Sequence, residues 1–176
     1  MELTSPKEIK RLLSKYETRP SKGLGQNFLI DKNILQKIIE SAEIKPTDTV
    51  LEVGPGIGTL TKELAQKAGK VIAVEKDGAM IEILKETLKD YKNVEIINGD
   101  ILKLENSEFF KNLKIKNYKI VSNIPYYLTS PLIRKFLESA TPPAKNYFND
   151  SKRGCPKNLR KAPQNELTGR IRTILC

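Results

Sequence analysis

The stretch Glu52–Thr61 constrains the fold of this chain more than any other part of it, because three glycines alternate with other residues there. An apolar run over residues 49–53 leads into it, and apolar residues at helical spacing follow it. A parallel strand that ends in glycines and turns at once into a helix is typical of an α/β sheet that meets a nucleotide-like ligand. Glycine allows the tight turn and the close approach of the backbone. A purely structural turn would use the same glycines, so this stretch alone identifies no ligand.

The glycine spacing narrows the ligand class. Gly54, Gly56 and Gly58 are two residues apart, and Thr59 stands where the dinucleotide fingerprint has its third glycine. This disfavours an NAD-dependent dehydrogenase. The chain has no histidine, which excludes histidine-based catalysis and histidine-ligated metals. Its two cysteines, Cys155 and Cys176, suggest neither a disulfide framework nor a zinc site, so we expect no metal.

Polar side chains follow the later predicted strands. Glu75 follows the apolar run 71–74, and Asp100 follows the run 94–97. The carboxyl ends of parallel strands share one sheet edge, where an acidic residue can accept hydrogen bonds from ribose hydroxyls. We therefore expect Glu75 to hold a ribose and Asp100 to accept a purine amine. The alternatives are a surface carboxylate for Glu75 and a turn-forming residue for Asp100.

The fourth predicted strand, residues 118–121, leads to Asn123-Ile124-Pro125-Tyr126. The residue before a proline is held extended, which would aim the Ile124 carbonyl and the Asn123 side-chain oxygen at one point. Tyr126 offers a flat surface for a base. A proline turn with a packed tyrosine is the plainer alternative. Ser130 and Pro131 then predict the start of a helix with Leu132, Ile133, Phe136 and Leu137 buried.

The N-terminal region contains a predicted helix and a predicted ligand lid. Ser5, Pro6 and Glu8 indicate a capped helix start. This helix either faces an RNA with its basic side or docks on the domain with that side in solvent. The following glycine-containing loop ends in Gln26-Asn27-Phe28-Leu29, whose amides and ring suit a lid over a ligand. Asp31 and Asp77 predict the caps of two further helices.

Charge and composition point to a polyanionic partner. The net charge is +10, but residues 141–176 hold eight Lys or Arg and two acids, so +6 of it lies there. Residues 144–176 show no helical or alternating period, and we expect little stable structure in them. We hypothesise a truncated or out-of-frame end as the reason for that loss. No apolar run is long enough to span a bilayer and no secretory signal is evident, so we expect a cytoplasmic protein.

Five motifs in order resemble the ribosomal RNA adenine dimethyltransferase family: residues 25–29, 52–61, 74–77, 99–100 and 123–126. The resemblance implies a Rossmann-like, S-adenosylmethionine-dependent methyltransferase fold, an α/β architecture with a doubly wound, mostly parallel sheet. It also implies that the family's C-terminal strands and helical RNA-binding domain are missing here. The predicted regions are a basic helix and loop (1–24), a partial catalytic domain (25–143) and an irregular basic tail (144–176).

The resemblance also implies an activity: dimethylation of the N6 amines of two adjacent adenosines in a hairpin loop near the 3′ end of small-subunit rRNA. The partner would be that rRNA or the assembling subunit, and the enzyme a monomer. Catalysis would fall to Asn123, Ile124, Pro125 and Tyr126, and stacking on the adenine to Phe28 and Tyr126. The residues implied to bind S-adenosylmethionine are Asn27, Leu29, Gly54, Gly56, Glu75, Asp100 and Asn123.

Two other functions stay open at this point. The related methyltransferase of macrolide resistance acts on a large-subunit adenosine and resembles the chain at the same motifs. The motif from Tyr126 to Pro131 and the glycine loop are more similar to those of the small-subunit enzyme. An RNA-binding assembly factor without catalysis, or an inactive fragment, is the alternative of another class.

Overall fold

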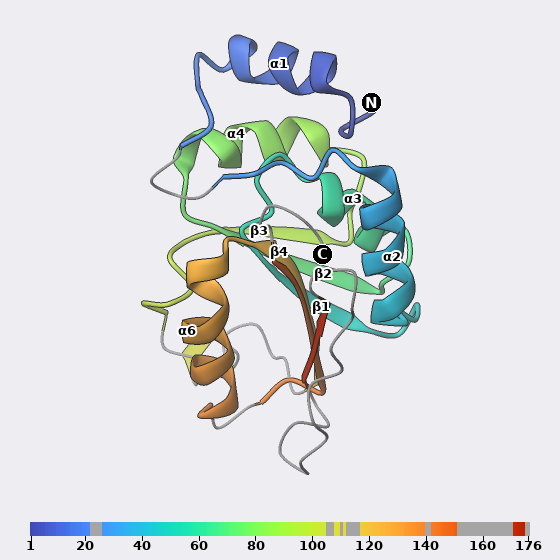
Figure 1. The fold of residues 1–176 in the computed structure, drawn as a ribbon, viewed down its shortest axis with the longest axis vertical. Helices are drawn as coiled ribbons and strands as arrows, with labels where there is room; N and C mark the ends of the chain where they lie inside the picture. Colours follow the sequence, from blue (N-terminus) through green and yellow to red (C-terminus); the bar gives the residue numbers. More distant parts are fainter. Residues whose placement is uncertain are drawn as a thin grey trace.

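Six parallel strands form one sheet in the order β3-β2-β1-β4-β5-β6 (Figure 1). The computed structural model describes residues 1–21, 26–104, 108–109, 111, 117–139, 142–150 and 171–174. The strands are β1 (Thr49–Val53), β2 (Lys70–Glu75), β3 (Val94–Asn98), β4 (Lys119–Ile124), β5 (Lys145–Asp150) and β6 (Ile171–Ile174). The strand order reverses between β1 and β4. The predicted doubly wound parallel sheet is therefore confirmed, and ligands of such sheets bind where the order reverses.

Helices cover both faces of this sheet. They are α1 (Pro6–Lys15), α2 (Lys32–Ala42), α3 (Thr59–Ala65), α4 (Gly78–Thr87) and α6 (Tyr126–Leu137). One core joins α2 and α3 to Val50, Val71 and Val121 of the sheet. The opposite core joins α6 to Leu51 and Ile120. Because neighbouring residues of β1 enter different cores, both faces of the central strand are buried, as its continuous apolar run predicts.

The helix α1 lies on α4 rather than on the sheet (Figure 1). Ile9 and Leu12 pack with Met80 and Ile83 of α4. The sequence left two alternatives for this helix: contact with an RNA, or docking on the domain. In the structure, its apolar face packs against α4.

Two of the predicted helix caps are confirmed and one is wrong. Asp31 accepts hydrogen bonds from the backbone N–H groups of Asn33 and Ile34, and Asp77 accepts one from Ala79. Ser5 precedes α1, but its side chain makes no cap hydrogen bond. The capping box does not form because Glu8 pairs instead with Arg11, at 2.9 Å.

The predicted start of the last helix at Ser130 is also wrong. α6 begins at Tyr126, directly after Pro125, so Pro131 lies inside the helix. Starting a turn earlier buries Thr129 and places Leu128 against the sheet core. Pro131 is exposed, so its missing N–H costs less there than in a buried turn. Leu132 and Phe136 are fully buried, as predicted, whereas Ile133 is only half-buried. The side chain of Leu137, also predicted to be buried, lies outside the described part.

The prediction of little stable structure after residue 143 is wrong for β5 and β6, and the later strands of the sheet are not all missing. β5 pairs with β4 over six residues, from Lys119 opposite Lys145 to Ile124 opposite Asp150. Asn146 and Tyr147 are each only 1% exposed. Their burial results from pairing with β4 and packing against α2, which a local pattern of mixed polarity does not reveal.

No helix in the described ranges is long and apolar enough to cross a membrane.

Candidate functional site

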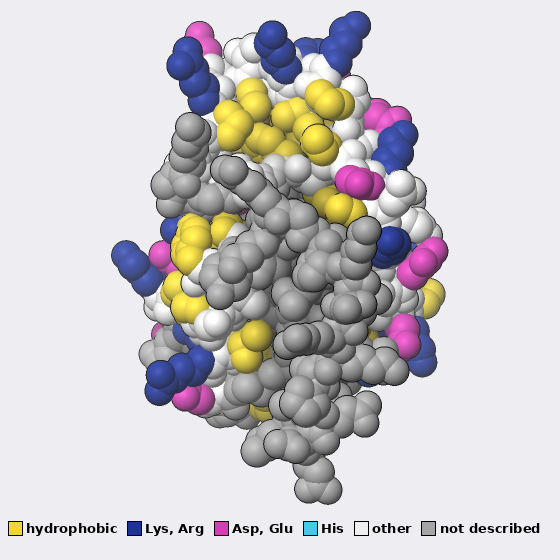
Figure 2. Space-filling view, viewed as in Figure 1, with side chains coloured by type: hydrophobic (Ala, Val, Ile, Leu, Met, Phe, Trp, Pro, Cys, Tyr) yellow, Lys and Arg dark blue, Asp and Glu magenta, His cyan; other side chains and the backbone are white. Residues whose placement is uncertain are grey.

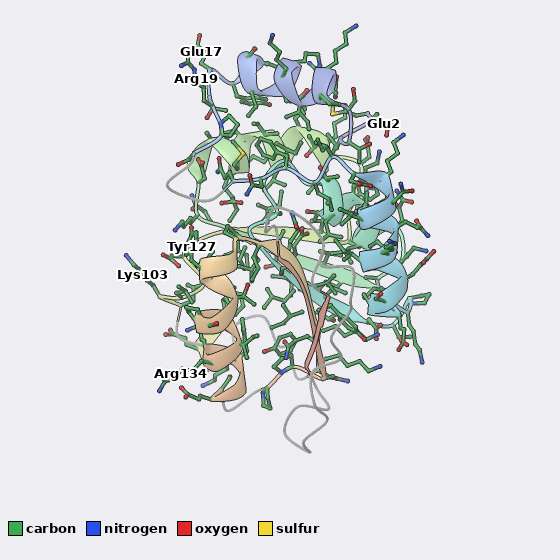
Figure 3. All side chains as sticks on the ribbon, in the orientation of Figure 1. Glu2, Glu17, Arg19, Lys103, Tyr127 and Arg134 are labelled. Atoms are coloured by element: carbon green, nitrogen blue, oxygen red, sulfur yellow. The ribbon has the colours of Figure 1, made fainter. Side chains whose placement is uncertain are left out.

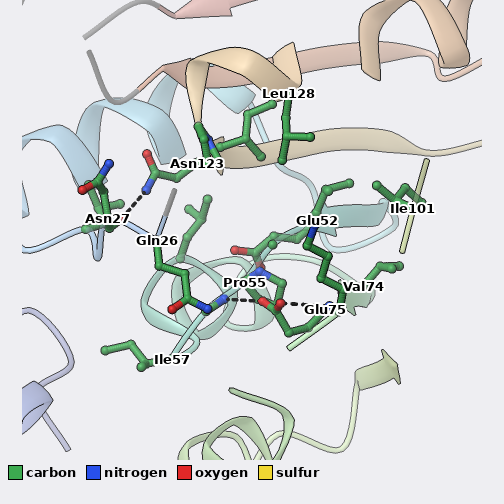
Figure 4. A pocket seen from close by; sticks show the side chains of 18 of the residues that line it. Gln26, Asn27, Glu52, Pro55, Ile57, Val74, Glu75, Ile101, Asn123 and Leu128 are labelled. Atoms are coloured by element: carbon green, nitrogen blue, oxygen red, sulfur yellow. Dashed lines mark hydrogen bonds between the residues drawn. The ribbon is translucent and has the colours of Figure 1, made fainter. Parts of the chain in front are cut away.

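One pocket lies at the carboxyl edge of the sheet, where β1, β2 and β4 end (Figure 4). Its walls come from five segments that are far apart in the sequence: residues 26–29, 52–57 with 59–60, 74–76 and 99–101, and opposite them 123–125 with Leu128. The predicted site residues that line it are Asn27, Phe28, Leu29, Gly54, Gly56, Glu75, Asp100, Asn123, Ile124 and Pro125. Tyr126 begins α6 beside them, but its side chain lies outside the described part. The fold therefore brings the predicted residues together.

The glycine loop adopts the left-handed backbone conformation at all three glycines, with φ of 65°, 59° and 88° at Gly54, Gly56 and Gly58. A Cβ atom on Gly54 would meet nothing within 4 Å, so only its backbone conformation requires glycine. A Cβ on Gly58 would lie 3.1 Å from Leu84 and 3.2 Å from Thr87 Oγ1 of α4. The first glycine therefore shapes the pocket, and the last allows α4 to pack closely against the loop.

Glu75 fixes the loop to the tip of β2. Its Oε2 accepts a hydrogen bond from Gly56 N–H at 3.1 Å, and its Oε1 accepts from Lys76 and Asp77 at 2.9 and 3.0 Å. The side chain is 6% exposed, and burial raises its pKa while these backbone donors lower it. A carboxylate has about four acceptor positions, so three backbone bonds leave capacity for a ligand hydroxyl.

Glu52 is a pocket residue that the sequence reasoning missed. It is 1% exposed, and its Oε2 has no hydrogen-bond partner among the described residues. Burial raises its pKa to about 8, with a further contribution from Glu75. Thr61 lies near enough to lower that pKa, but its Oγ1 is not aligned for a hydrogen bond and also has no partner. A carboxyl within a buried apolar strand is the signal that would have revealed this position.

Asp100 and the segment 26–29 form the rim. Asp100 Oδ1 accepts a hydrogen bond from Leu102 N–H at 3.0 Å, so it shapes the turn while it lines the pocket. Gln26 donates to Asp77 Oδ2 at 2.7 Å, which fastens this segment to the start of α4. Phe28 lies 3.5 Å from the position of a Cβ on Gly56. The predicted lid residues therefore pack over the glycine loop.

Asn123 faces the glycine loop from the other wall (Figure 4). Its Nδ2 donates to the backbone oxygen of Asn27 at 3.4 Å, which turns the donor side of the amide towards the lid segment. Ile124 is the last residue of β4 and is extended before Pro125, as predicted. The pocket thus has a glycine-and-carboxylate wall and, opposite it, an amide and a strand-end carbonyl.

The sequence matches a known family. The model of the ribosomal RNA adenine dimethylase family matches residues 18–153. The chain belongs to this family. Because the match continues to residue 153, family-like sequence does not end at Pro143 as predicted.

Relatives share the fold and much of the sequence. The chain is 50% identical over 141 residues to the ribosomal RNA small subunit methyltransferase A of Alkaliphilus metalliredigens, covering 80% of this chain and 49% of that protein. The 23S rRNA methyltransferase ErmE is similar in structure, with a TM-score of 0.59 and 36% identity over 68% of this chain and 46% of its own. A dimethyladenosine transferase from Plasmodium falciparum is also similar in structure, with a TM-score of 0.55 and 36% identity. The match covers 66% of this chain and 40% of that protein. The chain spans about half the length of the curated relatives it matches.

Proposed function

We propose that this chain carries the catalytic pocket of an S-adenosylmethionine-dependent dimethyltransferase that modifies the N6 amines of adjacent adenosines in small-subunit rRNA in the cytoplasm. The observation that carries the proposal is one pocket in which Gly54, Gly56, Glu75 and Asp100 face Asn123–Pro125. Five sequence motifs of the family contribute to it. The pocket and the family membership together support a methyltransferase over an NAD enzyme.

The residues of the pocket fit S-adenosylmethionine. The cofactor supplies a methyl group on a positively charged sulfonium and carries an ammonium group and a ribose. Glu75 has acceptor capacity for the ribose, and Asp100 accepts the adenine amine. Glu52 offers a buried carboxyl oxygen that lacks a partner, and a nearby cation or donor would satisfy it. Asn27, Leu29 and the glycine backbone close around the same ligand.

The acceptor wall prepares the target amine. The N6 lone pair of adenine is delocalised into the ring, which makes the amine a weak nucleophile. Asn123 Oδ1 and the Ile124 carbonyl accept the two N–H groups and favour a tetrahedral nitrogen with an available lone pair. Pro125 holds that carbonyl in place, and positioning with electrostatic support then lowers the barrier. No strong base is needed because the ammonium product loses its proton readily, which agrees with a chain that contains no histidine.

The target adenosine must leave its stack to enter such a pocket. Phe28 borders the pocket and Tyr126 begins the adjoining helix. We assign both rings to stacking on the extruded adenine, since base–aromatic stacking is the usual support for an unpaired base.

Small-subunit rRNA is favoured over large-subunit rRNA as the substrate. The curated relatives that match at 46–50% identity are named for the small subunit, whereas the similar structure named for 23S rRNA is 36% identical. Methylation of isolated small and large subunits with labelled cofactor, side by side, tests this choice. Label in the large subunit alone would contradict it.

Calorimetric titration of the chain with S-adenosylmethionine tests the proposal as a whole. Saturable binding that Glu75→Ala weakens is the expected result. Absence of binding would leave only a non-catalytic RNA-binding role for this chain.

A further inference from the structure

A second hollow lies beside the proposed methyl-transfer pocket, between α1 and the segment 26–30. We call it the N-terminal groove; its lining is Pro6, Ile9, Lys10, Leu13, Ser14, residues 17–20, Gln26, Asn27, Phe28 and Ile30. Gln26, Asn27 and Phe28 line both hollows. A single stretch of backbone therefore separates the two hollows. An RNA strand that crosses this stretch to reach the pocket would also pass through the groove.

The floor of the groove is apolar and partly open to solvent. Ile9 and Leu13 of α1 are buried beneath it. Ile30 stands at the other side with 53% of its surface exposed. Figure 2 shows apolar side chains gathered just below α1, with Lys and Arg side chains around them. An exposed apolar patch with a polar rim is typical of a binding surface.

The rim carries cations that form no ion pair with an acidic side chain of the described residues. Lys10 and Arg19 are exposed, and none of the ion pairs within the described ranges includes either. Arg11 and Lys15 of the same helix, in contrast, both pair with Glu86 of α4. α1 thus has one basic side that is used for docking and another that is left for a partner.

One acid lies in the groove. Glu17, at the end of α1 near Arg19 (Figure 3), is absent from the same set of ion pairs. Among the described residues, the charged side chains that line the groove are therefore two cations and one anion. Together with an apolar floor, this suits a nucleotide strand, which presents phosphates at its edge and flat bases or riboses to an apolar surface.

We propose that the N-terminal groove holds the nucleotides that flank the target adenosine. Their phosphates contact Lys10 and Arg19, and a base or ribose lies against Ile30 and Phe28. This inference rests on the proposed function, since it extends the RNA out of the adenosine pocket across the shared wall. A peptide would also fit an apolar groove, but the shared wall and the unpaired cations favour RNA.

Removal of both cations is the main test. An RNA hairpin with adjacent loop adenosines is titrated onto the unmodified chain and onto the double variant Lys10→Gln/Arg19→Gln, at several salt concentrations. Each lost contact to a single-stranded phosphate lowers the salt slope by about 0.7, so we expect about tenfold weaker binding at 0.15 M salt and a slope smaller by about 1.4.

The matched control is Lys67→Gln/Lys89→Gln. These two lysines are also exposed and outside the ion pairs of the described part. They precede β2 and β3, so they lie at the sheet edge opposite the pocket. The control is expected to bind RNA within twofold of the unmodified chain, because it loses the same charge at a distance from the groove.

Two single variants separate the apolar and electrostatic contributions. Ile30→Ser is expected to weaken RNA binding with an unchanged salt slope, because it removes an apolar contact only. Glu17→Gln is expected to tighten binding, since it removes the acid from the groove. Titration with S-adenosylmethionine should be unchanged in every variant.

Failure of the groove as an RNA site and failure of the proposed methyltransferase function give different results. If the cation variant and the control bind RNA equally while the unmodified chain binds cofactor and methylates RNA, the groove is not an RNA site and a protein partner becomes its better occupant. If the unmodified chain binds neither cofactor nor RNA, the proposed function fails and this inference fails with it.

Discussion

The glycine loop and Asn123 face the same pocket but are held by different means. The loop is fixed to β2 by two backbone N–H groups: Gly56 donates to Glu75 Oε2 at 3.1 Å, and Gly54 donates to the Val74 carbonyl at 2.9 Å. Gly58 also allows a close approach to α4. Asn123 is half-buried, and its side-chain amide donates a hydrogen bond of 3.4 Å to the backbone oxygen of Asn27 in the lid segment. Under the proposed function, we expect the glycine loop to be a preformed cofactor wall and the Asn123 side to tighten when an adenosine enters.

The largest expected effect is on the acceptor wall. Asn123→Ala removes the oxygen that we propose accepts a hydrogen bond from the target amine, and loss of one preorganised polar group typically costs about 10²–10³-fold in turnover. Cofactor affinity should change by less than about fivefold. Single-turnover methylation together with cofactor titration measures both. Equal losses of turnover and cofactor affinity would show that the two walls are not separate.

The second effect is on the cofactor wall. Glu75→Ala removes the acceptor of three backbone N–H groups and the proposed ribose contact. Hydrogen bonds to charged groups contribute about 1.5–3 kcal/mol, so we expect the dissociation constant for the cofactor to rise about 10- to 100-fold. Glu95→Gln is the control, since Glu95 is a half-exposed acid on β3 that pairs with Lys70. A similar loss in both variants would contradict the assignment.

The third effect separates the glycines. Gly58→Ala forces a left-handed residue and a clash with Leu84 and Thr87, and should lower the free energy of unfolding by about 1–3 kcal/mol. Gly54→Ala should cost less, since its Cβ meets nothing. Gly78→Ala, in α4 with open space, should be neutral or stabilising. Thermal unfolding ranks the three. Gly54→Ala as the most harmful change would contradict the packing role of Gly58.

The last effect is a pH dependence of stability that comes from Glu52. Its pKa rises from an ordinary 4.5 to about 8 in the folded state. The folded chain therefore holds a proton that the unfolded chain has lost, and Glu52 makes stability fall as pH rises from 4.5 to 8, by up to about 1.4 kcal/mol per unit. Above pH 8 this contribution is constant. Urea unfolding across this range should show a shallower pH dependence for Glu52→Gln. An unchanged dependence would exclude Glu52 as its source.

The sequence alone determined the sheet edge and most of the pocket. Continuous apolar runs predicted the parallel strands, and glycines, Glu75, Asp100 and Asn123 at their ends predicted one shared site, because parallel strands deliver their carboxyl ends to the same edge. The positive φ angles of Gly54, Gly56 and Gly58 were likewise implied by residue type. These features are local or follow from strand direction, so they needed no knowledge of packing.

Tertiary structure decided the rest. β5 was missed because Asn146 and Tyr147 become buried only when β4 and α2 cover them. α6 begins at Tyr126 rather than at Ser130, which packs Leu128 against the sheet core and leaves Pro131 on the exposed side of the helix. Glu52 became a pocket residue, and Lys10 and Arg19 the rim of a groove, only through the docking of separate segments. Burial and charge pairing depend on neighbours that are distant in sequence, and the fold alone brings those neighbours together.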